Sequence, residues 1–302
     1  MHDLDEFTVT DAVLDQMAKT TDPRLREIMA AAIRHLHAFA REVQLTPAEW
    51  LVGIGFMTEV GKMCTSARQE TILLSDVLGL SALVNAMHAK TALEKPTDAS
   101  LLGPFYRATS PHLELGAQIA ATPDAPELVF YGQVRDSAGH GIPHAMVQVW
   151  QTDAHGFYDL QLHGDDKMDN RASFTTDADG NFYFRTVRPL GYFIPLDGPV
   201  GRLISAQQRH GCRPAHIHFL IGADGFRELV TSLYFADDQY IDSDTVFGVS
   251  KSLIVEPGPD AGSPFPQLDA IHYDFTLSLA NADGESRVGA DPAQFIAVAG
   301  AH

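Results

Sequence analysis

The chain has few cysteines, few basic residues and no long apolar run, and each shortage excludes a class of protein. Only Cys64 and Cys212 occur in 302 residues, so a secreted framework of disulfides is not expected. Lysine and arginine number 21 against 39 aspartates and glutamates, a formal net charge of -18, which disfavours nucleic acid or an anionic membrane as the main partner. No apolar stretch approaches a membrane span, and the acidic N-terminus lacks the basic and apolar regions of a signal peptide. We therefore expect a soluble cytoplasmic protein.

The first third of the chain has the apolar spacing of helices. Between Leu25 and Val43 apolar residues recur every three or four positions, which predicts one long amphipathic helix. The segment Thr46-Pro47-Ala48-Glu49 has the form of a capping box with proline at the first helical position, so a second helix is expected to begin there. A third helix is predicted from about Ala67 to His88.

The pattern changes after Pro104, and from Glu127 the chain consists of short runs rich in β-branched and aromatic residues. Turn clusters such as Asp177-Ala178-Asp179-Gly180-Asn181 separate these runs. Many short strands with no helices between them predict a β-sandwich. The expected strands are Leu128–Val134, Ala145–Gln151, Asn181–Val187, His216–Ile221, Leu229–Phe235, Ser252–Val255 and Tyr273–Leu279.

The predicted fold class is therefore α+β, with a helical N-terminal domain followed by an all-β sandwich. We expect the helical domain over residues 1–105, a linker of prolines and small residues over 106–126, and the sandwich over 127–302. The amphipathic helices could close over the sandwich, join two copies of the chain or bind lipid.

The most informative segment is Arg213-Pro214-Ala215-His216-Ile217-His218-Phe219. Because they are two residues apart in an extended run, His216 and His218 point their rings to the same side, which suits a shared metal ion. Alternating histidines also occur as half-buried strand residues, so the pair alone leaves both interpretations open.

Two tyrosines lie upstream in glycine-flanked turns, Tyr158 after Gly156 and Tyr192 after Gly191. Phenolate oxygens suit a hard, highly charged cation, whose field lowers the pKa of a phenol from about 10 to below neutrality. Two phenolates and a hydroxide would neutralise three positive charges, so the combination indicates ferric iron. Taken singly, each tyrosine could equally be a core or turn aromatic.

Several ordered motifs resemble the intradiol ring-cleavage dioxygenases, and together they cover nearly the whole chain. They are Leu102-Gly103-Pro104-Phe105-Tyr106, Gly132-Gln133-Val134-Arg135-Asp136, Val147-Gln148-Val149-Trp150-Gln151-Thr152-Asp153 through Tyr158-Asp159, and Arg213-Pro214-Ala215-His216-Ile217-His218. Within that family the chain is most similar to hydroxyquinol 1,2-dioxygenases, notably in Leu73-Leu74-Ser75-Asp76-Val77-Leu78-Gly79 and Asp242-Ser243-Asp244-Thr245-Val246-Phe247-Gly248-Val249.

The resemblance implies a non-haem Fe(III) held by Tyr158, Tyr192, His216, His218 and a solvent hydroxide. An aromatic 1,2-diol would bind as a dianion, dioxygen would supply both inserted atoms, and the ring would open between the two hydroxyl-bearing carbons. Tyr192 would be displaced by the substrate and help to take up a substrate proton. Arg213 would supply a fixed positive charge near the ring, with a structural salt bridge as its alternative role.

The same resemblance implies a substrate cavity lined by several segments. Its residues are Leu73, Asp76, Leu101, Leu102, Gly103, Pro104, Phe105, Ile194, Pro195, Arg213 and Val246. Asp76 stands in an apolar run, where a carboxylate is costly unless it is exposed or partnered, and it could accept a hydrogen bond from a third substrate hydroxyl. Ser232 departs from the family, because catechol-cleaving relatives tend to carry the longer glutamine there, so any contact carried over from this position is in doubt.

These features predict an enzyme of aromatic catabolism that opens hydroxyquinol (benzene-1,2,4-triol) to 3-hydroxy-cis,cis-muconate, which tautomerises to maleylacetate. Cleavage of catechol or chlorocatechol is the alternative within the same chemistry. A non-catalytic binding module with an immunoglobulin-like sandwich is the alternative from a different class. Relatives form homodimers through the N-terminal helices and often enclose lipid there, so the resemblance implies both features here.

Overall fold

The computed structural model describes residues 4–65, 68–89, 95–121, 125–164 and 166–280. The chain forms two compact units, one running to Thr58 and the other starting at Glu59. Two short helices before residue 90 thus share a unit with the sheets. The domain boundaries expected at residues 105 and 127 remain a prediction, and parts of that division (122–124 and 281–302) lie outside the described residues.

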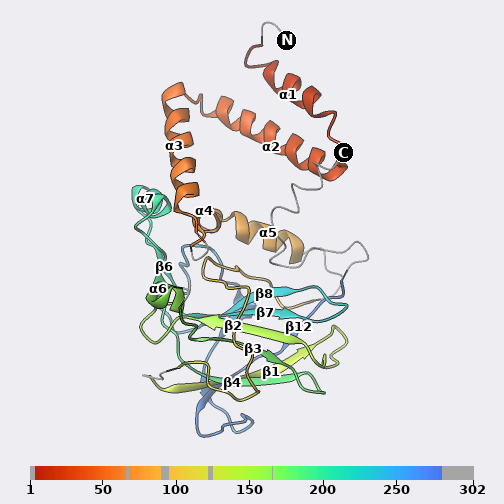
Figure 1. The fold of residues 1–302 in the computed structure, drawn as a ribbon, viewed down its shortest axis with the longest axis vertical. Helices are drawn as coiled ribbons and strands as arrows, with labels where there is room; N and C mark the ends of the chain where they lie inside the picture. The colour runs from red at the N-terminus through yellow and green to blue at the C-terminus, as the bar shows by residue number, and fades with distance from the viewer. Residues whose placement is uncertain (1–3, 66–67, 90–94, 122–124, 165, 281–302) are drawn as a thin grey trace. The chain divides into compact units, whose positions relative to one another are not determined.

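The helical spacing of the N-terminal region is confirmed by α1 (Val9–Met17), α2 (Pro23–Glu42) and α3 (Pro47–Met63), which appear in red and orange in Figure 1. The predicted capping box opens α3. The carboxylate of Glu49 accepts the backbone N–H of Thr46 at 2.9 Å, and Thr46 Oγ1 accepts the backbone N–H of Glu49 at 3.3 Å. These partners are three residues apart, so the local sequence suffices to begin the helix.

The single helix predicted from Ala67 to His88 is wrong, and its expected start lies outside the described residues. Two helices replace it, α4 (Glu70–Val77) and α5 (Leu80–Ala89), with a bend of 72° between them. Gly79 between them has φ of +74°, in the left-handed region that glycine adopts without strain, so α4 ends there. By length and composition the two could span a membrane only as a bent pair, and no single helix of the described chain could do so.

The predicted β-sandwich is confirmed, and Figure 1 shows its strands as arrows. One sheet has the order β10-β11-β1-β12, with β4 also paired to β1, and the other has the order β3-β2-β7-β8-β9. A third, two-stranded sheet joins β5 and β6. The strands are β1 (Glu127–Arg135), β2 (Met146–Gln151), β3 (Arg171–Thr175), β4 (Asn181–Val187), β5 (Tyr192–Phe193), β6 (Cys212–Arg213), β7 (His216–Gly222), β8 (Leu229–Phe235), β9 (Ile254–Val255), β10 (Gly258–Pro259), β11 (Asp269–His272) and β12 (Phe275–Thr276).

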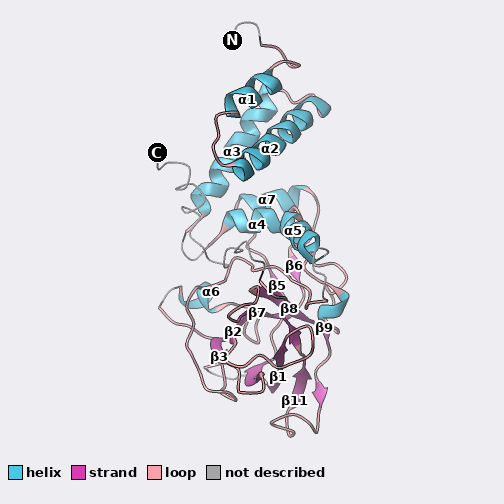
Figure 2. Ribbon diagram, turned by 90° about the vertical axis from the view of Figure 1, so that its right-hand side faces the viewer, coloured by secondary structure: helices cyan, strands magenta, loops and turns pink. Residues whose placement is uncertain are grey.

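The shortest elements were not expected from the sequence. Strands β5 and β6 contain two residues each, too few to display an alternation of apolar and polar residues. Two short helices, α6 (Asp159–His163) and α7 (Pro199–Ala206), interrupt the β region. A 3-10 turn at Lys251–Leu253 occupies the first half of the expected strand Ser252–Val255, and β9 occupies the second half. Helix α7 lies beside α4 (Figure 2), where Glu70 accepts the backbone N–H of Val200 at 3.2 Å.

The core between the two large sheets is rich in phenylalanine. Phe130 on β1 lies 5.5 Å from Phe184 on β4 and 4.9 Å from Phe219 on β7, between ring centroids. All three side chains are completely buried. In the second large sheet β7 pairs with β2 on one side and with β8 on the other (Figure 2), and β7 carries both histidines of the predicted metal site.

Candidate metal and substrate site

His216 and His218 lie on one face of β7, as the two-residue period of a strand predicts. Their Nε2 atoms are 3.0 Å apart. Behind the rings, His216 Nδ1 lies 2.7 Å from the carbonyl oxygen of Pro214, and His218 Nδ1 lies 2.9 Å from Ser232 Oγ. Because a carbonyl can only accept, His216 Nδ1 carries the proton and its Nε2 presents a lone pair toward the other ring.

The two predicted tyrosine ligands reach the same place from different segments. Tyr158 immediately precedes α6, and its phenol oxygen lies 3.3 Å from His216 Nε2. Tyr192 pairs with Arg213 across β5 and β6, so this short hairpin brings it beside the histidine strand. The two tyrosine rings are 5.3 Å apart at 89°, and their phenol groups are hydrogen-bonded to each other. All four predicted ligand side chains therefore converge, and we refer to them as the four-residue cluster.

Burial controls the protonation of this cluster. Burial, aided by the positive charge of Arg213, lowers the pKa of His216 to about 3. Burial and the neighbouring imidazole lower the pKa of His218 well below its ordinary value. Burial likewise raises the pKa of the Tyr158 phenol well above its ordinary value, and raises that of Tyr192 against the opposing charge of Arg213. Both imidazoles are therefore neutral near pH 7, which is the form that binds metal ions.

The donor atoms of the cluster fit a hard, highly charged cation. Ligand bonds of about 2.0–2.1 Å to nitrogen place neighbouring donor atoms about 3 Å apart around one ion. The two Nε2 atoms are separated by 3.0 Å, and the Tyr158 oxygen lies 3.3 Å from the nearer one. A cation's field would counteract the effect of burial on the phenol pKa values. No group of three or more His, Cys, Asp and Glu that could hold a metal occurs among the described residues.

The loop over residues 101–105 passes across the cluster. The ring of Phe105 stacks on that of Tyr158, with centroids 4.5 Å apart and planes inclined by 22°. Gly103 has φ of +74°, and a Cβ at this position would lie 3.4 Å from Cε1 of His218. The left-handed backbone conformation of residue 103 favours glycine, and it lets the loop lie against the imidazole. The backbone carbonyl of Leu101 accepts from the imidazole of His218, which partly opposes the lowering of its pKa.

A buried ion pair ties this loop to the Tyr158 segment. Arg171 Nε donates to a carboxylate oxygen of Asp159 at 2.7 Å, and Arg171 Nη2 donates to the backbone carbonyl of Phe105 at 3.2 Å. Asp159 is the residue after Tyr158, so one guanidinium links the ligand segment to the loop above it. Both charged side chains are almost fully buried, which makes the pair costly to break.

Asp76 on α4 is only 3% exposed, so the alternative of an exposed helix position is excluded. Burial raises the pKa of its carboxyl group to about 6, against a hydrogen bond from Ser81 and the positive charge of Arg213. Ser81 lies in the first turn of α5, and the bend at Gly79 allows it to contact the preceding helix. The carboxyl group is therefore partnered and close enough to Arg213 to sense its charge.

Replacing Asp76 by asparagine should change how the stability of the metal-free protein depends on pH. Because the folded-state pKa is above the ordinary value of 3.8, the stability contributed by the protonated carboxyl is lost as pH rises through about 6. A rise in the pKa from 3.8 to about 6 corresponds to a change of about 3 kcal/mol in the free energy of unfolding. Between pH 4 and pH 7, chemical denaturation should show the free energy of unfolding of the variant rising by up to this amount relative to that of the wild type. The exposed Asp242→Asn is the control, and equal pH dependence in all three proteins would contradict this assignment.

The other predicted wall residues lie on the same segments. Leu73 is about one helical turn before Asp76, Ile194 and Pro195 follow Tyr192 directly, and Pro104 lies between Gly103 and Phe105. The backbone N–H of Val246 donates to Asp244 at 3.3 Å. Of these wall residues, Leu73, Pro104, Ile194 and Val246 are buried, and Pro195 is half-buried.

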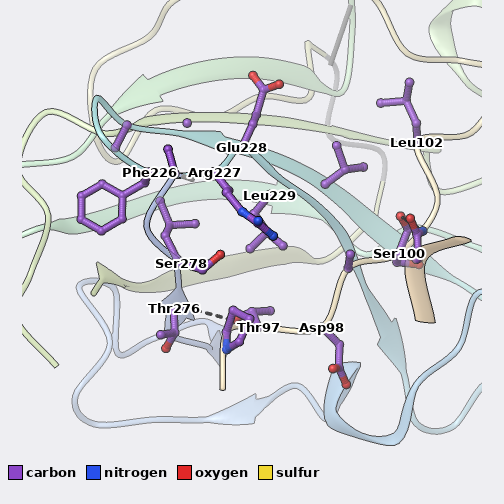
Figure 3. Close-up of a pocket in the computed structure, with 18 of the residues that line it drawn as sticks. Thr97, Asp98, Ser100, Leu102, Phe226, Arg227, Glu228, Leu229, Thr276 and Ser278 are labelled. Atoms are coloured by element: carbon purple, nitrogen blue, oxygen red, sulfur yellow. Dashed lines mark hydrogen bonds between the residues drawn. The ribbon is translucent and has the colours of Figure 1, made fainter. Parts of the chain in front are cut away.

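A groove of about 1860 Å³ borders this wall without including the four-residue cluster in its lining. It begins beside Asp76, Leu101 and Leu102 and extends toward Phe226 and Ser278. Figure 3 shows Ser100 and Leu102 on one side of the groove. Elsewhere in its lining, Thr97 Oγ1 accepts the backbone N–H of Thr276 at 2.9 Å. The groove is therefore adjacent to the predicted cavity, and the cluster lies outside it.

Sequence reasoning missed two side chains that hold His218. The indole of Trp150 stacks on its ring at 4.8 Å with planes only 4° apart, because β2 pairs Trp150 directly with His218. Ser232 is the opposite partner of His218 on β8, so its short hydroxyl reaches Nδ1 at 2.9 Å. Serine is shorter than the glutamine expected from relatives, but the strand register places Ser232 directly opposite His218, so it still makes a contact. The sequence did not reveal this register.

Comparison with known proteins gives consistent results along the chain. The family model described as Dioxygenase matches residues 101–279, and the model described as Catechol dioxygenase N terminus matches residues 22–95. The 6-chlorohydroxyquinol 1,2-dioxygenase of Cupriavidus pinatubonensis is 45% identical over 92% of this chain and 99% of that protein. The hydroxyquinol 1,2-dioxygenase of Nocardioides simplex is 43% identical over 91% of this chain and 96% of that protein. The crystal structure of hydroxyquinol 1,2-dioxygenase from Pseudomonas putida DLL-E4 matches with a TM-score of 0.80 at 39% identity, over 91% of this chain and 99% of that one.

Proposed function

Because the chain belongs to the intradiol ring-cleavage dioxygenases, we propose that it opens hydroxyquinol with dioxygen between the two adjacent hydroxyl-bearing carbons. Both oxygen atoms enter the product, 3-hydroxy-cis,cis-muconate, which tautomerises to maleylacetate. The observation that carries this proposal is the convergence of two phenols and two imidazoles beside a buried arginine. The names of relatives that are 43% and 45% identical support the choice of a trihydroxylated substrate.

We propose that Tyr158, Tyr192, His216 and His218 hold a non-haem Fe(III), with solvent as a further ligand. The spacing and burial of the donor atoms support this assignment. When bound, ferric iron supplies the Lewis acidity and redox character that allow a diol dianion to react with dioxygen. The protein supplies neutral imidazoles, two oxygen donors and a dry site in which charges interact strongly.

Tyr192 and Arg213 have additional roles in the proposed reaction. The phenol oxygen of Tyr192 takes up a proton from a substrate hydroxyl, and its hydrogen bond with Arg213 stabilises the charged form that can do so. Arg213 also faces the place where negative charge develops on the ring, because its Nη1 lies 3.2 Å from His216 Nε2. The buried guanidinium has little competing water, so its remaining donors interact strongly with nearby groups even though a carboxylate pairs with its other side.

Asp76 is proposed to select the substrate by accepting a hydrogen bond from the third hydroxyl. We expect Asp76→Ala to lower kcat/KM for hydroxyquinol by about 10- to 100-fold, since a hydrogen bond to a charged group contributes roughly 1.5–3 kcal/mol. The kcat/KM for catechol, which has no third hydroxyl, should change much less. Oxygen uptake and product spectra with hydroxyquinol, 6-chlorohydroxyquinol, catechol, chlorocatechols and protocatechuate measure this.

The same panel tests the proposed activity of the wild type. Catechol or chlorocatechol turning over faster than hydroxyquinol in the wild type would replace the proposed substrate. No oxygen uptake with any diol, from protein loaded with iron, would overturn the proposed reaction. Leu74→Met, a change of similar volume at a buried position of α4 that is not among the predicted wall residues, is the matched control for a general disturbance of the helix.

We further propose that two copies join through the N-terminal helices and enclose an amphipathic lipid. Large apolar side chains of α2 and α3 support this, because Leu36, Phe39, Trp50 and Val52 are between 52% and 73% exposed. Sedimentation velocity should give a dimer, and solvent extraction followed by mass spectrometry should recover lipid. A monomer at micromolar concentration would contradict the first part, and an extract without lipid the second.

The cytoplasmic location expected from the sequence is also part of the proposal. Cys64 and Cys212 are both free thiols, which supports a reducing compartment. The formal charge of -18 supports a small-molecule substrate and not nucleic acid as the partner. Fractionation of cells that produce the protein tests this location.

A further inference from the structure

The guanidinium of Arg213 is held from one side by a carboxylate that sequence reasoning did not assign to the site. Arg213 Nε lies 3.1 Å from Asp244 Oδ1, and Nη2 lies 3.2 Å from Asp244 Oδ2. Both side chains are 2% exposed. Two parallel hydrogen bonds fix the plane of a guanidinium as well as its position, so Asp244 determines the direction of the remaining donors.

Those remaining donors point toward the cluster. Arg213 Nη1 lies 3.2 Å from His216 Nε2, and the guanidinium also hydrogen-bonds the phenol of Tyr192. On the Nη2 side, Arg213 donates to the hydroxyl of Tyr234 at 3.2 Å. Rotation of the guanidinium away from the carboxylate would therefore remove the positive charge from the place where substrate is proposed to bind.

The same carboxylate also shapes the segment that carries Val246. Its Oδ1 accepts the backbone N–H of Val246 at 3.3 Å, and its Oδ2 accepts that of Gly248 at 3.0 Å. The carbonyl of Gly248 accepts a hydrogen bond from Ser100 Oγ at 3.0 Å. A Cβ at Gly248 would lie 2.6 Å from the hydroxyl of Tyr234, so the segment packs directly against the residues that hold the arginine.

We propose that Asp244 is a positioning residue for ring cleavage, which directs the charge of Arg213 toward the substrate and places Val246 in the cavity wall. The inference rests on the proposed function and adds the group that orients its arginine. The carboxylate of Asp244 thereby connects Arg213, whose charge stabilises the reacting ring, with Val246 in the cavity wall. The residue acts through Arg213 and Val246 and does not need to touch the substrate.

The test compares Asp244→Asn with the wild type, both loaded with iron and normalised to iron content. Asparagine keeps the shape but removes the charge and one acceptor, so the guanidinium is no longer fixed. We expect kcat for hydroxyquinol to fall by about 10- to 100-fold, as for partners that orient other active-site groups. Binding of the probe 4-nitrocatechol, followed by its absorbance without oxygen, should weaken by about tenfold. Iron content should stay equal to that of the wild type.

The matched control is Asp274→Asn. Asp274 also pairs with an arginine, Arg135 at 3.1 Å, and also accepts a backbone N–H, that of Gln133 at 3.0 Å. Its substitution should leave kcat per iron and affinity for 4-nitrocatechol unchanged. Adding Asp244→Asn to Arg213→Met should lower kcat little further, because the carboxylate acts mainly through the arginine.

Tyr234→Phe provides a second variant should Asp244→Asn fail to fold. It removes only the hydroxyl that holds Nη2, so kcat should fall less than in Asp244→Asn while iron content stays normal. Unchanged kcat per iron and unchanged 4-nitrocatechol affinity in the variants that fold would overturn the positioning role. A wild type that consumes no oxygen with any diol would instead overturn the proposed function itself, so the two failures are distinguishable.

Discussion

Replacing Tyr158 by phenylalanine should give a folded protein that binds little iron and cleaves hydroxyquinol at least about a thousandfold more slowly. The substitution removes one oxygen from a set of four donors while keeping the ring that stacks on Phe105 at 4.5 Å. A Lewis acid contributes several kcal/mol of transition-state stabilisation, and each 1.36 kcal/mol changes the rate by about tenfold. Iron analysis and visible absorption measure the loss of iron, and oxygen uptake measures the loss of activity. Colour is informative because charge transfer from phenolate to ferric iron absorbs visible light.

Tyr131→Phe is the control for this experiment. Tyr131 lies on β1, where its hydroxyl donates to Asp260, and its loss should leave iron content, colour and kcat as in the wild type. Normal iron content and unchanged activity in Tyr158→Phe would show that this phenol is no ligand. The proposed metal site would then have to be abandoned, although the family assignment would stand on its own comparisons.

Replacing Arg213 by methionine should have a second large effect, on catalysis and stability together. Removing a fixed donor from a site of developing charge commonly lowers kcat by about 10² to 10³. Asp244 would also remain buried without its partner, which should reduce the free energy of unfolding by about 3–5 kcal/mol. Oxygen uptake per bound iron measures the first effect, and urea denaturation of the metal-free protein measures the second.

Arg135→Met separates these effects from the general loss of an arginine. Arg135 pairs with Asp274 at 3.1 Å, but its side chain is 38% exposed, so water can replace the lost partner. Its kcat should match the wild type and its stability should change by less than about 1 kcal/mol. Wild-type kcat per iron in Arg213→Met would refute the electrostatic role and leave the arginine as a structural salt bridge.

Two of the four predicted ligands, the histidines, are recognisable from the sequence because their signal is local. The two-residue period of an extended strand puts His216 and His218 on one face whatever surrounds them. The capping box at Thr46 and Glu49 likewise depends on partners three residues apart. Tyr158 and Tyr192 carry a weaker signal of their own, and they became interpretable only through the resemblance of longer motifs to a family.

The orientation of those ligands depends on pairing between distant segments. Ser232 reaches His218 only because β8 pairs with β7 in one register, and a shift of one residue would turn its hydroxyl to the other face. Asp244 is 31 residues from Arg213 in the chain, and nothing in its local sequence indicates an ion pair. The bend at Gly79 was missed because the apolar spacing continues across it.

The amino-acid sequence by itself therefore determined that a helical part precedes a β-sandwich, that the two histidines share one face, and which chemical types indicate a hard cation. These follow from periodicity and side-chain chemistry, which act over a few residues. Only the tertiary structure decided that Asp76 is buried, that Ser232 and Trp150 hold His218, and that Asp244 directs Arg213. Burial and strand register are properties of segments far apart in the chain, so they exist only once the sheets have packed.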